Sequence, residues 1–325
     1  MRRALLVVVC LLAACGPSST EPLGGDGGYS GGGWNGPGGS GGEGGTGGDE
    51  VRDRLAVAAY NVRRFFDTVC DSGECGPGDY EEVPTQAEFE AKGDTLAAAI
   101  RRLAPDAICL EEVENQRAFD ALSARLPEFV STVMGESGYA ASVDVAFLAR
   151  DPVTLVRRHR NRTLTRPDGS STSFAREFLE VHLDVDGTEA IVFCAHFKSK
   201  SGDDPGRRLA EAQGAAAILA EEAARSPDAL IVLGGDLNDV PGSEPLEALE
   251  ASGELLRVAS DMTGSQATYT YNGRAQALDH LYVHLGAGGG YVAGSTAIFR
   301  DGPGQGLGGS DHAAIRALFR PGARD

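Results

Sequence analysis

The sequence predicts a mixed α/β fold built in layers, rather than a purely parallel doubly wound sheet. Apolar strand-like runs alternate with amphipathic helical segments in the first half of the chain, and closely spaced strand pairs follow in the second half. Several runs are apolar along their whole length, which is typical of strands buried on both faces. With 325 residues, of which 42% are hydrophobic, the chain can form a sizeable core.

Hydrophobic periodicity and turn residues place the individual elements. The expected strands are residues 55–62, 107–114, 142–150, 153–158, 175–184, 189–197, 229–233, 268–271 and 278–283, and a last strand that begins near residue 312. The expected helices are residues 84–103, 116–126 and 207–224, and a fourth that Ser243 caps. We expect a polar loop at 161–173, and we expect the strands at 268–271 and 278–283 to pair with each other.

The first 50 residues are predicted to lie outside the folded domain. Arg2 and Arg3 precede an apolar run that is too short to span a bilayer, which is typical of a cleaved signal peptide. The segment Leu12-Ala-Ala-Cys15-Gly16 resembles the lipobox of bacterial lipoproteins and implies lipidation of Cys15; an ordinary signal peptide with an incidental cysteine is the alternative. The glycine-rich residues that follow are expected to form a flexible tether.

This organisation predicts a lipoprotein signal peptide at residues 1–14, lipidated Cys15 with its tether at 15–50, and one domain at 51–325. The protein is then expected at the bacterial cell envelope, anchored by lipid at the outer membrane or cell surface, or released from it. No protein partner is evident from the sequence.

Four cysteines remain in the expected domain. Cys70 and Cys75 bracket a polar loop, and an oxidising compartment favours a disulfide between them. Cys109 and Cys194 lie in apolar strand-like runs, where we expect each to act as a small hydrophobic residue. The paired Cys/His spacing of a zinc site is absent.

Polar residues of the types used in catalysis stand at the ends of the predicted strands. They are Asn61, Glu112, His196, Asp236 with Asn238, and Asp279, and a glycine-rich loop brings Asp311 and His312 to the last strand. Strand alternation sends Glu112 and Glu114 to one face and Glu111 to the other. Carboxylates packed this closely repel one another unless a cation binds among them, so the pattern favours a divalent-cation site.

The motifs at these strand ends resemble those of the endonuclease/exonuclease/phosphatase superfamily, which has the DNase-I-like fold. They are Asn61-Val-Arg-Arg-Phe-Phe-Asp67, Leu110-Glu-Glu-Val-Glu-Asn115, His196-Phe-Lys-Ser-Lys200 and Gly235-Asp-Leu-Asn-Asp239, and they are most similar to those of secreted bacterial deoxyribonucleases. The resemblance runs from about Leu55 to Leu318. It implies a four-layer α/β/β/α sandwich, in which helices flank two packed mixed sheets and the site lies at one end.

The resemblance also implies a role for each residue. Glu112 would bind Mg²⁺, or Mn²⁺ or Ca²⁺ in its place, assisted by Asn61 and Asp311. His312 would act with Asp279, either as general base or as a stabiliser of the attacked phosphate. The remaining roles are Asp236 and Asn238 for the water and phosphate, His196 for phosphate oxygens, and Arg63, Arg176 and Lys198 for substrate binding. The glutamate that pairs with the second histidine in pancreatic-type enzymes is missing at Ala141, and Asp144 is a candidate replacement.

These roles predict a metal-dependent phosphodiesterase, most simply an endonuclease that hydrolyses DNA by in-line attack of water. A formal charge of −18 gives no long-range attraction for nucleic acid, so divalent ions and local cations would have to hold the substrate. A membrane-lipid headgroup phosphodiesterase of the sphingomyelinase type and a phosphomonoesterase are alternatives on the same scaffold. A surface binding module without activity is disfavoured, because the metal and nucleophile positions are intact.

Overall fold

The structure is a computed structural model that describes residues 52–322. The predicted signal peptide, Cys15 and the tether lie outside the described residues. Between residues 52 and 322, no helix combines the length and the apolar character that crossing a membrane requires.

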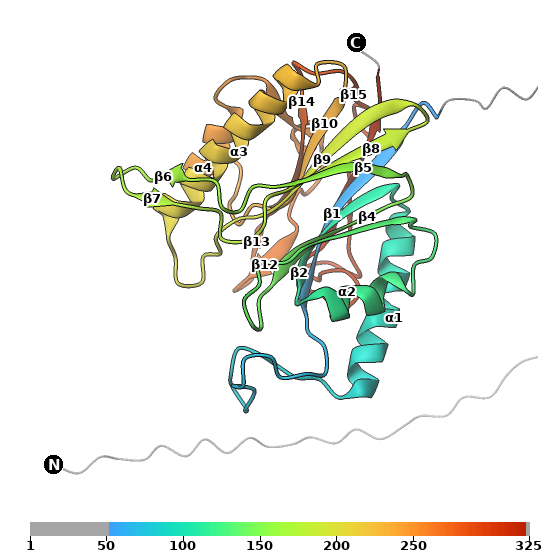
Figure 1. Cartoon of the computed structure of the whole chain (residues 1–325), viewed down its shortest axis with the longest axis vertical. Coiled ribbons are helices and arrows are strands. Elements are labelled where there is room, and N and C mark those ends of the chain that lie inside the picture. Colours follow the sequence, from blue (N-terminus) through green and yellow to red (C-terminus); the bar gives the residue numbers. More distant parts are fainter. Residues whose placement is uncertain (1–51, 323–325) are drawn as a thin grey trace, which may run out of the picture. The chain divides into compact units, whose positions relative to one another are not determined.

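Two mixed sheets form the centre of the domain (Figure 1). The first sheet has the order β15-β17-β1-β2-β4-β3, with β16 also paired to β17, and its strands are β1 (Leu55–Phe65), β2 (Ala107–Val113), β3 (Ser131–Gly135), β4 (Asp144–Ala149), β15 (Gly290–Tyr291), β16 (Ala297–Phe299) and β17 (Ala314–Arg320). The second has the order β11-β14-β10-β9-β8-β5, and its strands are β5 (Val153–Arg158), β8 (Leu179–Val185), β9 (Thr188–His196), β10 (Leu230–Asp236), β11 (Leu255–Arg257) and β14 (Asp279–His284).

Helices cover the outer face of each sheet. Helices α1 (Gln86–Leu103) and α2 (Gln116–Ser123) share an apolar cluster with the first sheet, and α3 (Pro205–Arg225) and α4 (Glu244–Glu250) share another with the second. A third cluster fills the space between the sheets, where Val57 and Phe147 of one meet Val192 and Val232 of the other. The four-layer α/β/β/α sandwich is therefore confirmed.

The expected pairing of the strands near residues 270 and 280 is wrong. Strand β12 (Tyr269–Tyr271) pairs with β13 (Arg274–Gln276) in a hairpin, whereas β14 pairs with β10 and β11. Asn272 and Gly273 both have positive φ, 48° and 74°, which suits the tight turn of a two-residue hairpin. The polar loop expected at 161–173 also contains a short hairpin, β6 (Leu164–Thr165) with β7 (Ser171–Thr172).

The expectation that Cys109 and Cys194 act as separate hydrophobic residues is also wrong. They form a disulfide that joins β2 to β9 and therefore one sheet to the other. Both residues belong to the cluster between the sheets and are fully buried. Alternation along each strand points the two side chains into the same layer, and packing of the sheets brings them opposite each other.

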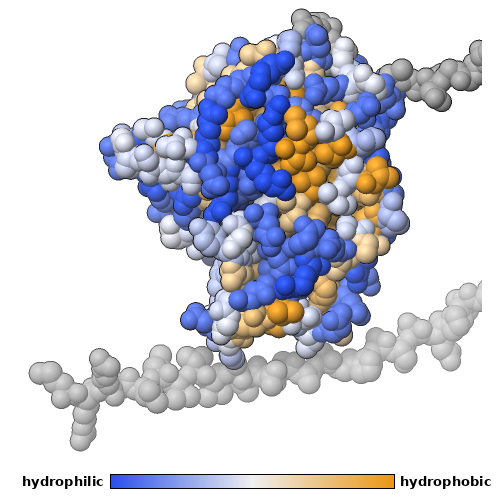
Figure 2. Space-filling view, in the orientation of Figure 1, coloured by the Kyte–Doolittle hydropathy of each residue, from blue (hydrophilic) through white to orange (hydrophobic). Residues whose placement is uncertain are grey.

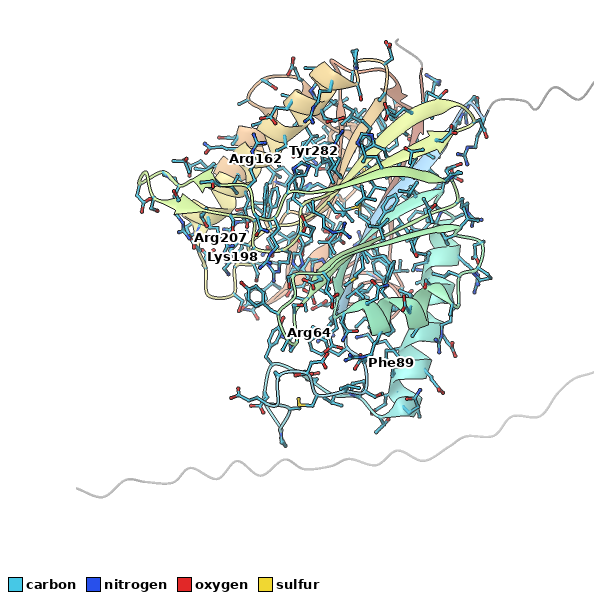
Figure 3. The ribbon with its side chains drawn as sticks, viewed as in Figure 1. Arg64, Phe89, Arg162, Lys198, Arg207 and Tyr282 are labelled. Carbon is cyan, nitrogen blue, oxygen red and sulfur yellow. A yellow bond between two sulfur atoms is a disulfide. The ribbon has the colours of Figure 1, made fainter. Side chains whose placement is uncertain are left out.

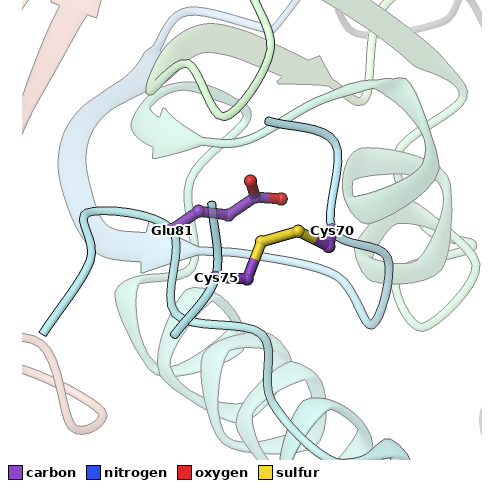
Figure 4. A group of neighbouring side chains, drawn as sticks. All are labelled: Cys70, Cys75 and Glu81. Atoms are coloured by element: carbon purple, nitrogen blue, oxygen red, sulfur yellow. A yellow bond between two sulfur atoms is a disulfide. The ribbon is translucent and has the colours of Figure 1, made fainter. Parts of the chain in front are cut away.

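Cys70 and Cys75, between which the sequence favours a disulfide without establishing it, are disulfide-bonded. It lies in the loop between β1 and α1, close to the buried carboxylate of Glu81 (Figure 4). The oxygens of Glu81 accept hydrogen bonds from the amides of Asp71 and Ser72, at 2.6 and 2.7 Å. This surface loop is therefore held by a covalent bond and by an internal carboxylate that satisfies its backbone.

A buried ionic cluster ties the second sheet to α3. Glu180 and His182 of β8 lie beside Glu222 of α3, and Arg157 of β5 binds both glutamates. The ring of His182 contacts Glu180 at 2.7 Å and Glu189 at 2.8 Å. Burial lowers the pKa of His182, but these two carboxylates outweigh burial and raise the pKa above its usual value.

Replacing His182 with glutamine is expected to lower the free energy of unfolding by about 2 kcal/mol at acidic pH. The pKa of His182 is raised in the folded state. The stability that protonated His182 contributes is therefore complete below its unfolded-state pKa of about 6.5, and it is lost as the pH rises through its folded-state pKa. Thermal unfolding of wild type and variant across pH measures this difference. His284→Gln is the control. Burial lowers the pKa of His284, so the stability that His284 contributes rises with pH instead of falling. A difference that does not vary with pH would contradict the prediction.

Candidate active site

A cleft of about 1460 Å³ lies at the carboxyl ends of β1, β2, β9 and β10. The predicted site residues that line it are Arg63, Glu112, Arg176, His196, Lys198, Asp236, Asn238, Asp311 and His312. Asn61 and Asp279 lie beneath them and are hydrogen-bonded to them. The structure therefore brings all the residues predicted for chemistry and substrate binding in the domain to one place.

Asn61 connects the two halves of the site. Its side-chain nitrogen donates to Glu112 in the first sheet at 3.3 Å and to Asp236 in the second at 3.1 Å. Its oxygen accepts from the backbone amide of Arg63 at 2.9 Å. Asn61 thus orients both carboxylates, and the metal-ligand role predicted for it stays a prediction.

Glu112 reaches the cleft because β2 is irregular at this residue. Its φ is +66°, and the pairing register shifts between Glu111 and Val113. The expectation that alternation groups Glu112 with Glu114 is therefore wrong. Glu114 instead accepts from the amide of Asp67 at 2.6 Å, at the base of the loop that follows β1.

The same irregularity leaves Glu111 buried between the sheets. Neither of its carboxyl oxygens has a hydrogen-bond partner among the described residues. Burial raises the pKa of Glu111 well above its usual value, and the charges of Asp279 and Asp236 act in the same direction. Glu111 therefore places a further acidic side chain directly below the site. Strand alternation had predicted that Glu111 points to the opposite face from Glu112.

His312 is held by Asp279. The ring Nδ1 lies 2.9 Å from Asp279, and Nε2 lies 4.0 Å from Asp236. Burial lowers the pKa of His312, but the charges of Asp279 and Asp236 outweigh burial and raise the pKa to about 10. The ring is therefore positively charged at neutral pH, which suits the binding of a phosphate oxygen.

Asp236 lies between the two histidines at the end of β10. His196 Nε2 is 3.8 Å from Asp236, which also accepts from the amide of Asn238 at 2.9 Å. Burial raises the pKa of Asp236 to about 7, with the charge of Asp279 adding to the shift and that of His312 opposing it. The neighbouring Gly235 is required by close packing, because a Cβ there would lie 1.9 Å from the carbonyl oxygen of Ala195.

His196 is neutral and lacks a carboxylate partner on its inner nitrogen. Burial, together with the charges of Arg176 and His312, lowers the pKa of His196 well below its usual value. Its Nδ1 is buried with no hydrogen-bond partner in residues 52–322. The suggested replacement, Asp144, instead accepts from the amide of Ser137 and the hydroxyl of Ser142, at 2.8 and 2.7 Å.

The donor atoms at Glu112 suit a hard divalent cation such as Mg²⁺. Each Glu112 oxygen accepts one hydrogen bond in the described part of the chain, from Asn61 or from the amide of Arg64, so lone pairs remain for a cation. Asp311 lies in the same cleft and its side chain is 40% exposed. Mg²⁺ takes few protein carboxylates and completes its shell with water and phosphate oxygens. Glu112 and Asp311 are therefore the residues that would hold it, and Asn61 orients Glu112 through its side-chain nitrogen.

Basic side chains from both sheets surround these groups. Arg63 lies near the carboxyl end of β1 and pairs with Asp311 at 3.6 Å, and Arg176 precedes β8 and donates to the carbonyl oxygen of Phe197 at 3.2 Å. Arg64 is the next residue of β1, and Lys198 follows β9; both line the same cleft and are labelled in Figure 3. Positive charge is thus gathered at the cleft of an otherwise acidic protein.

Sequence reasoning missed two features of the cleft. Lys92 of α1 donates to the carbonyl oxygens of Arg63 and Arg64, at 2.6 and 2.9 Å, and burial lowers its pKa to about 8. It thereby holds both arginines in backbone conformations with positive φ. The second feature is a set of tyrosines, namely Tyr80, Tyr139, Tyr269 and Tyr271. Their position in turn-rich segments of a chain with only 6% aromatic residues was an available signal.

Replacing Asp279 with asparagine is expected to lower kcat about 100-fold with a smaller change in KM. The carboxylate fixes the ring of His312 and stabilises its charged form, and these effects matter most when charge develops on the reacting phosphate. Steady-state kinetics on a small phosphodiester measures both constants. Asp261→Asn is the matched control, because Asp261 lies outside the cleft; an equal loss in both variants would refute the role of Asp279.

Comparisons with known structures support the fold. D. rerio TDP2 complexed with single strand DNA product is 12% identical, with a TM-score of 0.57, and the match covers 83% of this chain and 100% of that chain. An endonuclease/exonuclease/phosphatase from Bacteroides vulgatus is 15% identical, with a TM-score of 0.58 and coverage of 83% and 100%. The human Nocturnin catalytic domain with bound sulfate anion is 15% identical, with a TM-score of 0.58 and coverage of 83% and 94%. At these identities, the likenesses show the fold alone.

A search of curated protein sequences finds no match. The model described as "Endonuclease/Exonuclease/phosphatase family" matches residues 58–312, which include every site residue named above. The chain therefore belongs to the endonuclease/exonuclease/phosphatase family.

Proposed function

We propose that the protein is an endonuclease that hydrolyses DNA with the aid of Mg²⁺, and that Cys15 anchors it at the bacterial cell envelope. Family membership makes the chain a metal-dependent phosphoester hydrolase, so the proposal concerns the substrate, the metal and the location. Its main support is a single cleft that combines the acidic and imidazole groups with basic side chains from both sheets. The likeness to secreted bacterial deoxyribonucleases at Asn61–Asp67 and Leu110–Asn115 favours DNA as well.

The size of the cleft favours a polymeric substrate. Pockets for small molecules usually measure about 300–1,000 Å³, and this cleft is about 1460 Å³. Arg63, Arg176 and Lys198 are positioned to contact phosphates along a strand. Because the chain carries a net charge of −18, binding would depend on these local contacts and would weaken steeply with added salt.

The geometry assigns a task to each half of the site. Asp236, with its carboxylate fixed by Asn61 and Asn238, is placed to take the proton of the attacking water. In this proposal His312 would stabilise the phosphate oxygens from one side of Asp236, and His196 would contact them from the other. Glu112 would hold the divalent cation, and the cation would neutralise charge on the phosphate.

One parallel assay tests this proposal. The purified protein is given supercoiled plasmid, RNA, sphingomyelin vesicles, bis(p-nitrophenyl) phosphate and p-nitrophenyl phosphate, each with Mg²⁺, Mn²⁺, Ca²⁺ or EDTA. The proposal expects nicking of the plasmid with Mg²⁺ and none with EDTA. Turnover of sphingomyelin without cleavage of DNA would replace it with the lipid headgroup reaction, and turnover of the monoester alone would replace it with a phosphomonoesterase.

A further inference from the structure

Aromatic side chains gather around the cleft from three separate loops. Tyr80 lies between β1 and α1, Tyr139 lies between β3 and β4, and Tyr271 is on the β12–β13 hairpin. They are 50%, 70% and 58% exposed, and within residues 52–322 they are the only exposed tyrosines. An aromatic ring is more favourable when it is buried than when it is exposed to water. Three exposed rings at one cleft therefore indicate a ligand with flat apolar faces.

Arginines are paired with two of these rings. The guanidinium carbon of Arg64 lies 4.5 Å from the ring centroid of Tyr80, and that of Arg160 lies 4.8 Å from the centroid of Tyr139. The Tyr80 ring also meets Phe66 edge-on, with centroids 6.1 Å apart. Each pair therefore offers a ring for stacking beside a cation for a neighbouring phosphate, which is the combination used by proteins that hold unpaired nucleotides.

The rings continue to the reacting groups. Tyr269, two residues before Tyr271 on β12, packs against the ring of His312 with centroids 4.7 Å apart. On the other side, the amide of Arg64 binds Glu112 at 2.9 Å. The aromatic positions are thus connected through short contacts to both His312 and the carboxylate of Glu112.

We propose that the tyrosines of this cleft stack on unpaired bases, so that the site prefers single-stranded DNA, or a DNA segment with unstacked bases, to continuous duplex. In a duplex, each base is already stacked on its neighbours, and a protein side chain meets only groove edges and backbone. A free ring face can be used fully only when the bases are exposed. This inference rests on the proposed function and names the form of DNA that the same site accepts.

The loop that presents Tyr80 is held by internal bonds. They are the Cys70–Cys75 disulfide and the hydrogen bonds from the amides of Asp71 and Ser72 to the Glu81 carboxylate. The ring of Tyr269 is held by its contact with the ring of His312. Preorganised rings lose little freedom when a base binds, which increases the affinity that each one contributes.

The test compares one end-labelled oligonucleotide in three forms: single-stranded, annealed to its complement, and as an abasic strand with the same backbone. We expect kcat/KM for the single strand to exceed that for duplex by about ten-fold or more, and the abasic strand to be a poor substrate. Tyr80→Ala and Tyr271→Ala should each raise KM for the single strand about ten-fold, the size of one lost stacking contact. Tyr80→Phe should retain wild-type KM, and Leu155→Ala, on β5 outside the cleft, is the surface control.

Two results would contradict these proposals, and they can be distinguished from each other. If duplex is cleaved as well as the single strand, or if the alanine variants affect the abasic strand equally, the tyrosines do not stack on bases, although DNA hydrolysis stands. If no form of DNA is cleaved while bis(p-nitrophenyl) phosphate is, the proposed function itself fails. Unfolding temperatures of the variants should match wild type, because the replaced rings are exposed.

Discussion

Replacement of Glu112 by glutamine is expected to reduce kcat about 10³-fold while the fold is retained. Glutamine keeps the size of the side chain, and its single amide oxygen can accept from either Asn61 or the backbone amide of Arg64, which bind different oxygens of Glu112. It removes the negative charge that would hold the divalent cation. Neither neighbouring glutamate can replace that charge, because Glu111 is buried and Glu114, just after β2, accepts from the backbone amide of Asp67. Turnover of plasmid and of bis(p-nitrophenyl) phosphate, followed by a Mg²⁺ titration, measures the effect.

Glu82→Gln is the matched control for this variant. Glu82 lines the same cleft, its side chain is 77% exposed, and it pairs with Arg64 at 3.6 Å. The change of charge is identical, so a general electrostatic effect of the cleft would act on both variants. We expect less than about a two-fold change for Glu82→Gln. Comparable losses in the two variants, or unchanged Mg²⁺ dependence in Glu112→Gln, would refute the assignment of the metal carboxylate.

Removal of the disulfide between the sheets should give the largest loss of stability. The bond closes a loop with a sequence separation of 85, which corresponds to about 4.5 kcal/mol in the chain-entropy model. For a domain of this size, the double variant Cys109→Ala/Cys194→Ala should unfold at a temperature lower by about 10 °C or more. Differential scanning calorimetry without reductant measures this shift.

The second disulfide provides a comparison within the same protein. Cys70 and Cys75 are separated by 5 residues, for which the same model predicts about 2 kcal/mol. Cys70→Ala/Cys75→Ala should therefore lower the unfolding temperature by less than half as much. Equal shifts in the unfolding temperature would show that the greater length of the loop closed by the Cys109–Cys194 bond adds nothing to stability. Alanine at Cys109 and Cys194 also avoids placing unpaired polar groups in the core.

Much of the site could be predicted from the sequence because strand ends are visible there. Apolar runs mark buried strands, and the polar residues that follow them, such as His196 and Asp236, must lie at the edge of a sheet. Parallel pairing of β9 with β10 then places these two side by side, with His196 opposite Asp236. Local pattern and simple topology were sufficient for this part of the prediction.

Features that depend on long-range packing could not be predicted in this way. The partnership of Cys109 with Cys194 requires the register of one sheet against the other, which no local pattern contains. Strand alternation failed at Glu112, because the positive φ there breaks the regular pleat. The β12–β13 hairpin is different in kind: Asn272-Gly273 is a strong turn signal in the sequence itself, and it was overlooked.

The distribution of apolar and aromatic residues over the surface could also be found only from the structure. Figure 2 shows a largely hydrophilic face interrupted by apolar areas, which agrees with the acidic composition. Composition alone does not reveal that Tyr80, Tyr139 and Tyr271 converge on one cleft, because they lie far apart along the chain.

The covalent link between β2 and β9 has a practical consequence for anyone who produces this protein. Cytosolic glutathione and thioredoxin keep thiols reduced, so a recombinant chain made in an ordinary bacterial cytoplasm would emerge without the bond between Cys109 and Cys194. Since both sulfurs are fully enclosed, later air oxidation of the folded chain would be slow. Shelf life and heat-inactivation half-times would then differ between periplasmic and cytoplasmic preparations of the same sequence.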